Sequence, residues 1–143
     1  MRTLLDNVGL FTALRWQLKN AGARTQIKCT DSLPASEPRL DSRAAIALFR
    51  SAQEALAVGL ERTDITELDL VGSVNDQELS LQLASNGRDP PTGRTDITNL
   101  MLESLRHRMR TLGGAVQLEI LPSGGILLRM TAPLANVIAT HQT

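Results

Sequence analysis

Residues 45–60 carry the feature that most constrains the fold, an apolar stripe that repeats with the period of an α-helix. Its members are Ala45, Leu48, Phe49, Ala52, Leu56, Gly59 and Leu60. Because residues three and four apart share one face of a helix, the stripe predicts an amphipathic helix of about five turns. Asp41 or Ser42 is expected to cap its N-terminus. A helix with one broad apolar face must bury that face, so we expect it to pack at the centre of the domain.

Two more helices are predicted by the same spacing. In the first, Leu10, Leu14 and Leu18 recur at every fourth position between Gly9 and Ala21. In the second, the repeating residues are Met101, Leu102, Leu105, Met109 and Leu112. Gly113 and Gly114 follow directly and are expected to end that helix.

Alternation of apolar and polar residues predicts the strands. One hairpin is expected to pair the segments 68–70 and 79–83 around Asn75 and Asp76. A second is expected to pair 116–120 with 126–130 around Ser123, Gly124 and Gly125. A short strand is predicted over Thr25–Thr30, a connection over Asp31–Pro38, and a loop over Asn86–Thr95 that contains Pro90, Pro91 and Gly93.

The predicted order is therefore helix, strand, helix, hairpin, loop, helix, hairpin. Strictly alternating strands have one buried and one solvated face, so helices should cover only one side of the sheet. We predict an α/β (α+β) two-layer sandwich with a mixed, mostly antiparallel sheet. The domain is expected to span residues 1–135, and residues 136–143 are expected to form a C-terminal tail that frays after Pro133.

Composition excludes several functions. The 143 residues suit one domain, and their 15 basic residues balance 15 acidic ones, which argues against a nucleic-acid surface. No apolar run approaches the roughly 20 residues that span a bilayer, and no signal-peptide pattern begins the chain. We expect a cytoplasmic protein without membrane contact. Cys29 is the single cysteine, with no Cys or His at ligand spacing, so no metal site is predicted and a buried or strand-edge thiol is expected.

Four segments resemble one known family. QEALAVGLER, residues 53–62, resembles the nucleotide-binding helix of sensor histidine kinases, which reads close to QEALTNALKH. The family's entry helix and first strand resemble LLDNVGLFTALRWQLKNAGARTQIKC, its adenine-loop strand LSLQLASNG, and its last helix and hairpin LRHRMRTLGGAVQLEILPSGGILLRM. The chain thus resembles the ATP-binding (HATPase, GHKL or Bergerat-fold) domain of two-component sensor histidine kinases, in particular the nitrate-sensor-like branch. The resemblance implies that family's fold.

The resemblance places two residues of the helix at positions with known chemistry. The family's Asn, which chelates the magnesium bound to ATP, is replaced by Val58. An isopropyl group has no oxygen lone pair for magnesium. Glu54 matches the general base of several Bergerat ATPases, but a Glu at the polar edge of an amphipathic helix also fits a solvated or hydrogen-bonded structural role.

The adenine motif of the family, Asp-x-Gly-x-Gly, matches residues 85–89. Ser85 replaces the Asp, Gly87 retains the first glycine, and Asp89 replaces the second. A serine accepts a hydrogen bond but carries no charge, so the charge-assisted contact to adenine is lost.

The phosphate motif, Gly-x-Gly-Leu, falls on Asn99 and Met101, and the methionine would crowd a phosphate that approaches a helix N-terminus. Arg106 and Arg108 match the basic positions that follow, although they also fit a charged outer helix face. Gly125 and Ile126 match a Gly-Thr pair, so a hydroxyl is lost.

Four nucleotide contacts are weakened in this comparison. At about 1–3 kcal/mol for each lost polar interaction, a micromolar site moves toward millimolar affinity. We therefore expect no cofactor, and an ATPase-like C-terminal domain of a sensor kinase or a relative that is inactive in ATP binding and phosphotransfer. It would act by protein contact, and its expected partners are the dimerisation helices of a sensor kinase or a response regulator.

Two alternatives remain open. In one, the chain is a functional kinase catalytic domain that binds ATP and magnesium through divergent contacts, with Glu54 as general base, and phosphorylates a His on a separate dimerisation segment. Neither His107 nor His141 resembles that phosphoacceptor. In the other, Val58 and Met101 convert the old site into a pocket for an apolar ligand.

Overall fold

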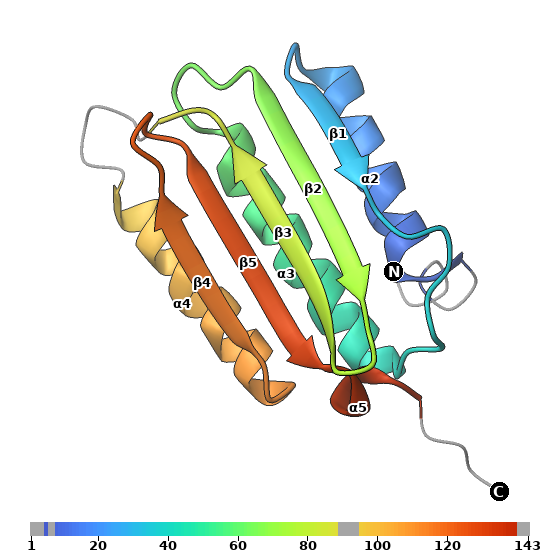
Figure 1. The fold of residues 1–143 in the computed structure, drawn as a ribbon. Coiled ribbons are helices and arrows are strands. Elements are labelled where there is room, and N and C mark those ends of the chain that lie inside the picture. Colours follow the sequence, from blue (N-terminus) through green and yellow to red (C-terminus); the bar gives the residue numbers. More distant parts are fainter. Residues whose placement is uncertain (1–4, 6–7, 89–94, 140–143) are drawn as a thin grey trace, which may run out of the picture.

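The computed structural model describes residue 5, residues 8–88 and residues 95–139, with the side chains of residues 95–97 left out. Its elements are α2 (Leu10–Arg24), β1 (Lys28–Ser32), α3 (Ser42–Leu60), β2 (Glu67–Val74), β3 (Glu78–Ser85), α4 (Thr95–Thr111), β4 (Ala115–Ile120), β5 (Ile126–Pro133) and α5 (Leu134–Val137). Figure 1 shows α2, α3 and α4 side by side on one face of a single sheet. The predicted two-layer α/β sandwich is confirmed.

The sheet is mixed, with strand order β1-β2-β3-β5-β4. Only β1 and β2 pair in parallel, and the remaining neighbours are antiparallel. Both predicted hairpins are present. At the tip of the β2–β3 hairpin, Oδ1 of Asn75 accepts the backbone N–H groups of Gln77 and Glu78 at 2.7 and 2.9 Å. An Asn side chain that satisfies its own turn in this way sets the register of the flanking strands.

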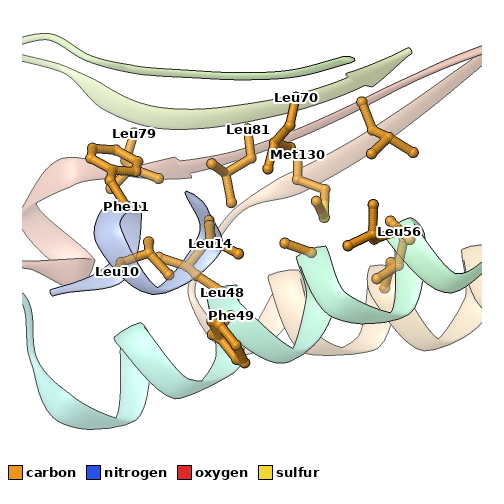
Figure 2. Close-up of a cluster of buried hydrophobic side chains, with 14 of the residues drawn as sticks. Leu10, Phe11, Leu14, Leu48, Phe49, Leu56, Leu70, Leu79, Leu81 and Met130 are labelled. Atoms are coloured by element: carbon orange, nitrogen blue, oxygen red, sulfur yellow. The ribbon is translucent and has the colours of Figure 1, made fainter. Parts of the chain in front are cut away.

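The core lies between the helices and the inward-facing residues of the sheet. Figure 2 shows Leu10, Phe11 and Leu14 from α2 and Leu48 and Leu56 from α3 between the helices and Leu70, Leu79, Leu81 and Met130 of the sheet. Phe49 of α3 belongs to the same buried cluster. All of these side chains are buried. Because the strands alternate, the inward-facing leucines of β2 and β3 belong to this cluster, as the sequence predicts: Leu68, Leu70, Leu79, Leu81 and Leu83.

The helix ends follow local chemistry. Asp41 caps α3, and its Oδ2 accepts the N–H of Ala44 at 3.1 Å, so Asp41 and not Ser42 fills the predicted capping position. The first amides of α2 are satisfied from a distance, because the carboxylate of Glu37 accepts the N–H groups of Leu10 and Phe11. A negative charge also suits a helix N-terminus. Glu37 therefore ties the connection before α3 to the start of α2.

The first strand begins three residues later in the chain than the sequence pattern predicts. It covers Lys28–Ser32 in place of Thr25–Thr30, and it takes Asp31 and Ser32 from the predicted connection. The reason is that Thr25 still belongs to the end of α2, where its hydroxyl donates to the carbonyl of Ala21 and accepts the N–H of Ile27. Cys29 lies in this edge strand and is partly exposed.

The expected fraying after Pro133 is wrong for the residues that the structure describes. The chain forms α5, where Val137 is fully buried and its carbonyl accepts the N–H of Asp41. Ile138 then forms an antiparallel bridge with Leu40. These contacts anchor residues 134–139 to the start of α3. The domain limit at residue 135 stays a prediction.

The central position of β3 leads to a test of the core. We expect Leu81→Ala to lower the free energy of unfolding by about 2–5 kcal/mol, because it leaves a cavity beneath the helices at a fully buried site. Gln82→Ala, on the opposite face of the same strand, is the matched control and should change stability by less than about 0.5 kcal/mol. Urea unfolding followed by circular dichroism measures both. Equal losses would contradict the assignment of the two faces.

Candidate functional site

The predicted nucleotide-site residues lie on three parts of the fold. Glu54 and Val58 belong to α3, Asn99 and Met101 to α4, and Ser85, Gly87 and Gly125 lie where β3 ends and β5 begins. β3 and β5 are neighbours in the sheet, and Ser85 is paired with Ile126. The structure thus joins Ser85 and Gly125, and it joins Glu54 to α4. No hydrogen bond within the described residues links Asn99, which is exposed, to the others.

Ser85, at the position of the adenine-binding Asp, is buried and bonded inside the protein. Its hydroxyl donates to the carbonyl of Gly59 on α3 at 3.1 Å, and the residue is only 2% exposed. A buried hydroxyl with a partner costs little, whereas one without a partner is destabilising. The geometry therefore gives Ser85 a role in joining β3 to α3.

Gly87 and Gly125 allow the chain to approach itself. A Cβ atom on Gly87 would lie 2.8 Å from Cβ of Arg62 and 3.0 Å from the carbonyl oxygen of Thr63. A Cβ atom on Gly125 would lie 2.7 Å from the backbone oxygen of Ser85. Backbone atoms cannot yield to such contacts as a flexible side chain does, so packing within the chain accounts for both glycines.

Arg62 is a site residue that the sequence reasoning missed. It follows the end of α3, is only 5% exposed, and donates from its guanidinium to the carbonyl of Gly124 in the β4–β5 turn. Buried arginines are rare unless they are paired. The bond from Arg62 to Gly124 holds the β4–β5 turn next to the end of α3. The available signal was its spacing, since Arg62 follows Gly59 of the α3 stripe by three residues.

The segment after β3 is held by a second arginine. Arg88 forms a backbone bridge with Thr63, and its side chain forms an exposed ion pair with Asp64. Asp64 is the non-glycine residue with positive φ, 58°, in the described part of the chain. Asp89, Pro90, Pro91 and Gly93 of the predicted loop lie outside the described residues, as does His141.

Glu54 bridges two helices. Its Oε1 accepts the hydroxyl of Ser104 at 2.9 Å and Nη1 of Arg108 at 2.7 Å, and both charged side chains are about one third exposed. A general base needs a free lone pair directed at water or substrate. In this geometry Oε1 serves two contacts within the protein, which hold the carboxylate between α3 and α4, and Oε2 has no hydrogen bond among the described residues. The arrangement fits the structural role that the sequence left open for Glu54.

Val58 and Met101 are apolar packing residues. Met101 is 2% exposed and belongs to the core cluster, and Val58 packs against that cluster while partly exposed. Among the described residues, no group of three or more His, Cys, Asp and Glu side chains is arranged to hold a metal ion. None of the helices in this part of the chain combines the length and apolar character that a membrane-spanning helix needs.

The two other predicted basic residues differ in environment. Arg108 forms an ion pair with Glu54 of α3. Arg106 is exposed on α4 and pairs with Glu103 of the same helix at 3.7 Å. Neither guanidinium is therefore arranged as an isolated phosphate ligand.

Comparison with known proteins identifies the fold. No known family model matches the sequence, and no curated protein matches it significantly. Among solved structures, it resembles the Erythrobacter litoralis EL346 blue-light activated histidine kinase (TM-score 0.66, 16% identity, 88% of this chain and 45% of that chain). It also resembles the catalytic domain of histidine kinase ThkA (0.67, 14%, 87% and 91%) and the mycobacterial sensor histidine kinase MprB (0.64, 12%, 92% and 95%).

These similarities confirm the predicted fold, that of histidine kinase ATP-binding domains. The chain spans less than half of the E. litoralis protein, and the identities are low, so the likeness is one of fold alone. The nitrate-sensor-like branch stays a prediction.

The Glu54–Arg108 contact generates a quantitative prediction. A double-mutant cycle with Glu54→Gln and Arg108→Met should give a coupling energy of about 0.5–1 kcal/mol, the range of a partly exposed ion pair after solvent screening. The same cycle at Glu103 and Arg106, an exposed pair within one helix, should give less than about 0.5 kcal/mol. Urea unfolding of the wild-type protein, the four single variants and the two double variants provides both values. A coupling near zero at Glu54 would contradict its bridging role.

Proposed function

We propose that this domain is a pseudo-ATPase, a histidine-kinase ATPase-like domain that works by contact with other proteins in signal transduction. The observation that carries the proposal is that polar groups at the expected nucleotide positions, and Arg62 near them, form hydrogen bonds within the chain. Ser85 bonds to Gly59, Arg62 bonds to Gly124, and Glu54 bonds to Ser104 and Arg108. A nucleotide would have to replace these contacts with contacts of its own.

Metal chemistry supports the same proposal. Magnesium prefers oxygen ligands in near-octahedral geometry, and it is usually held by one or two carboxylates together with substrate phosphates. The position of the family's chelating Asn is Val58, and the nearby carboxylate of Glu54 is bonded to Arg108. These residues do not fit a magnesium–ATP complex. We therefore propose that the domain functions without either.

The proposed partners follow from the fold. The solved structures that share this fold include sensor histidine kinases, and this likeness supports a sensor-kinase context for the chain. We propose that it docks on the dimerisation helices of a sensor kinase or on a response regulator, in the cytoplasm. The apolar-ligand alternative gains no support from Met101, because this side chain packs in the core.

A functional kinase domain is the second candidate, and Glu54 is the observation that favours it. Its carboxylate is partly exposed and stands where several related ATPases hold a general base. For this role Glu54 would have to exchange Arg108 for a water molecule near the terminal phosphate. Phosphotransfer to a supplied dimerisation segment, lost in Glu54→Gln, would establish this candidate.

Calorimetric titration with a non-hydrolysable ATP analogue, with and without magnesium, tests the proposal. We expect no saturable heat up to about millimolar ligand, because the metal position is Val58, the adenine position is a serine bonded to Gly59, and Met101 of the phosphate motif packs in the core. Circular dichroism and cooperative thermal unfolding of the same sample are the controls for folding. Saturable binding in the micromolar range would overturn the pseudo-ATPase proposal and favour the second candidate.

A further inference from the structure

Charge is distributed unequally between the two layers of the domain. Helices α2, α3 and α4 contain eight basic and three acidic residues, whereas the five strands contain two basic and five acidic residues. The chain as a whole has no formal net charge. The helical layer is therefore basic and the strands are acidic, a division that the overall composition hides.

Ion pairs within the domain lower the number of basic side chains that remain available to a partner. Arg15 pairs with Asp31, Arg106 with Glu103, and Arg108 with Glu54. The remaining basic residues of the three helices are exposed and form no ion pair within the described part of the chain: Lys19, Arg24, Arg43, Arg50 and Arg110. Both helical carboxylates with described side chains, Glu54 and Glu103, already form ion pairs with Arg108 and Arg106. The surplus charge is thus available to a partner.

Three of these residues lie on α3 and α4, which pack side by side and run in opposite directions (Figure 1). The Glu54–Arg108 contact shows which residues of α3 and α4 lie side by side along the two helices. Arg50 lies one turn before Glu54 on α3, and Arg110 lies just beyond Arg108 on α4. Because the helices are antiparallel, both steps lead toward the same end of the pair. Arg50 and Arg110 therefore lie at a similar level on neighbouring helices.

Arg43 extends this surface along α3. It precedes Arg50 by seven residues, which is two helical turns or about 10.5 Å. Carboxylates seven residues apart on a second helix have the same spacing. Between the arginines, Ala47 gives α3 a small side chain that leaves room for close approach. The surface has both the charge and the period to receive an acidic helix.

We propose that Arg43, Arg50 and Arg110 form a docking surface for an acidic helical segment of a partner protein. The inference rests on the proposed function by protein contact, and it assigns that contact to the outer face of α3 and α4. In this inference Arg43, Arg50 and Arg110 contact the partner. Arg106 and Arg108, the basic residues that the sequence singled out, do not, because their charges are compensated within the domain. A nucleic-acid partner is disfavoured by the sequence pI of about 6.7, since nucleic-acid-binding domains are usually strongly basic.

The test uses a fluorescent helical peptide of about 20 residues with glutamates and leucines at helical spacing. A peptide with lysines in place of the glutamates is its control. Fluorescence anisotropy with the 143-residue chain should show saturable binding of the acidic peptide only. We expect Arg50→Gln combined with Arg110→Gln to weaken that binding about three- to thirtyfold, the effect of two exposed ion pairs.

Lys19→Gln combined with Arg24→Gln is the matched variant, because it removes the same charge from α2. It should change the affinity less than about twofold at an ionic strength of about 0.15 M, where distant charges are screened. Equal weakening by both variants would show a general charge effect and overturn the docking surface. Absence of acidic-peptide binding, or tighter binding to a DNA duplex or to phosphatidylserine vesicles, would also overturn it.

Calorimetry on the same samples separates this inference from the proposed function. Binding of ATP together with an Arg50- and Arg110-dependent peptide complex would overturn the pseudo-ATPase proposal and retain the docking surface. Absence of both ATP binding and peptide binding would retain the pseudo-ATPase proposal and overturn the docking surface.

Discussion

The packing of α3 against the inward face of the sheet is the contact on which the rest of the structure depends. Its closeness is visible at Gly59, where a Cβ atom would lie 3.0 Å from Cδ1 of Leu68 and 3.1 Å from Cδ2 of Leu83. Such contact fixes the rotation of the helix about its axis. That rotation turns Glu54 toward α4 and leaves Arg50 in solvent. The apolar stripe therefore decides what the polar residues of α3 can do.

Most of the fold was predictable because it is encoded in short periods. The α3 stripe and the alternation in β2 and β3 each depend on neighbours in sequence, and they fix which faces are buried. The first strand was placed too early because Thr25 closes the end of α2, a hydrogen-bond preference that periodicity does not contain. The helix α5 was missed because its anchoring depends on contact with residues 40–41, which lie nearly 100 positions earlier in the chain.

The candidate site was less predictable, for a related reason. The resemblance singled out Glu54, Ser85, Gly87, Asn99 and Gly125, but it said nothing about their partners. Ser85 contacts a residue 26 positions away, and Arg108 contacts one 54 positions away. Such pairs arise only when the layers are assembled. Arg62 was overlooked because the sequence shows an ordinary charged residue at a helix end, and its burial depends on the β4–β5 turn.

The strand order has a consequence for how the domain holds together. Each hairpin is local, yet β3 and β5, which meet in the middle of the sheet, bring together residues as distant as Glu78 and Pro133. This seam joins the first two thirds of the chain to the last third. Without it, β3 and β5 would each expose an unpaired backbone edge and half of a core. Neither segment forms a complete layer alone, so the domain is expected to fold and unfold as one cooperative unit.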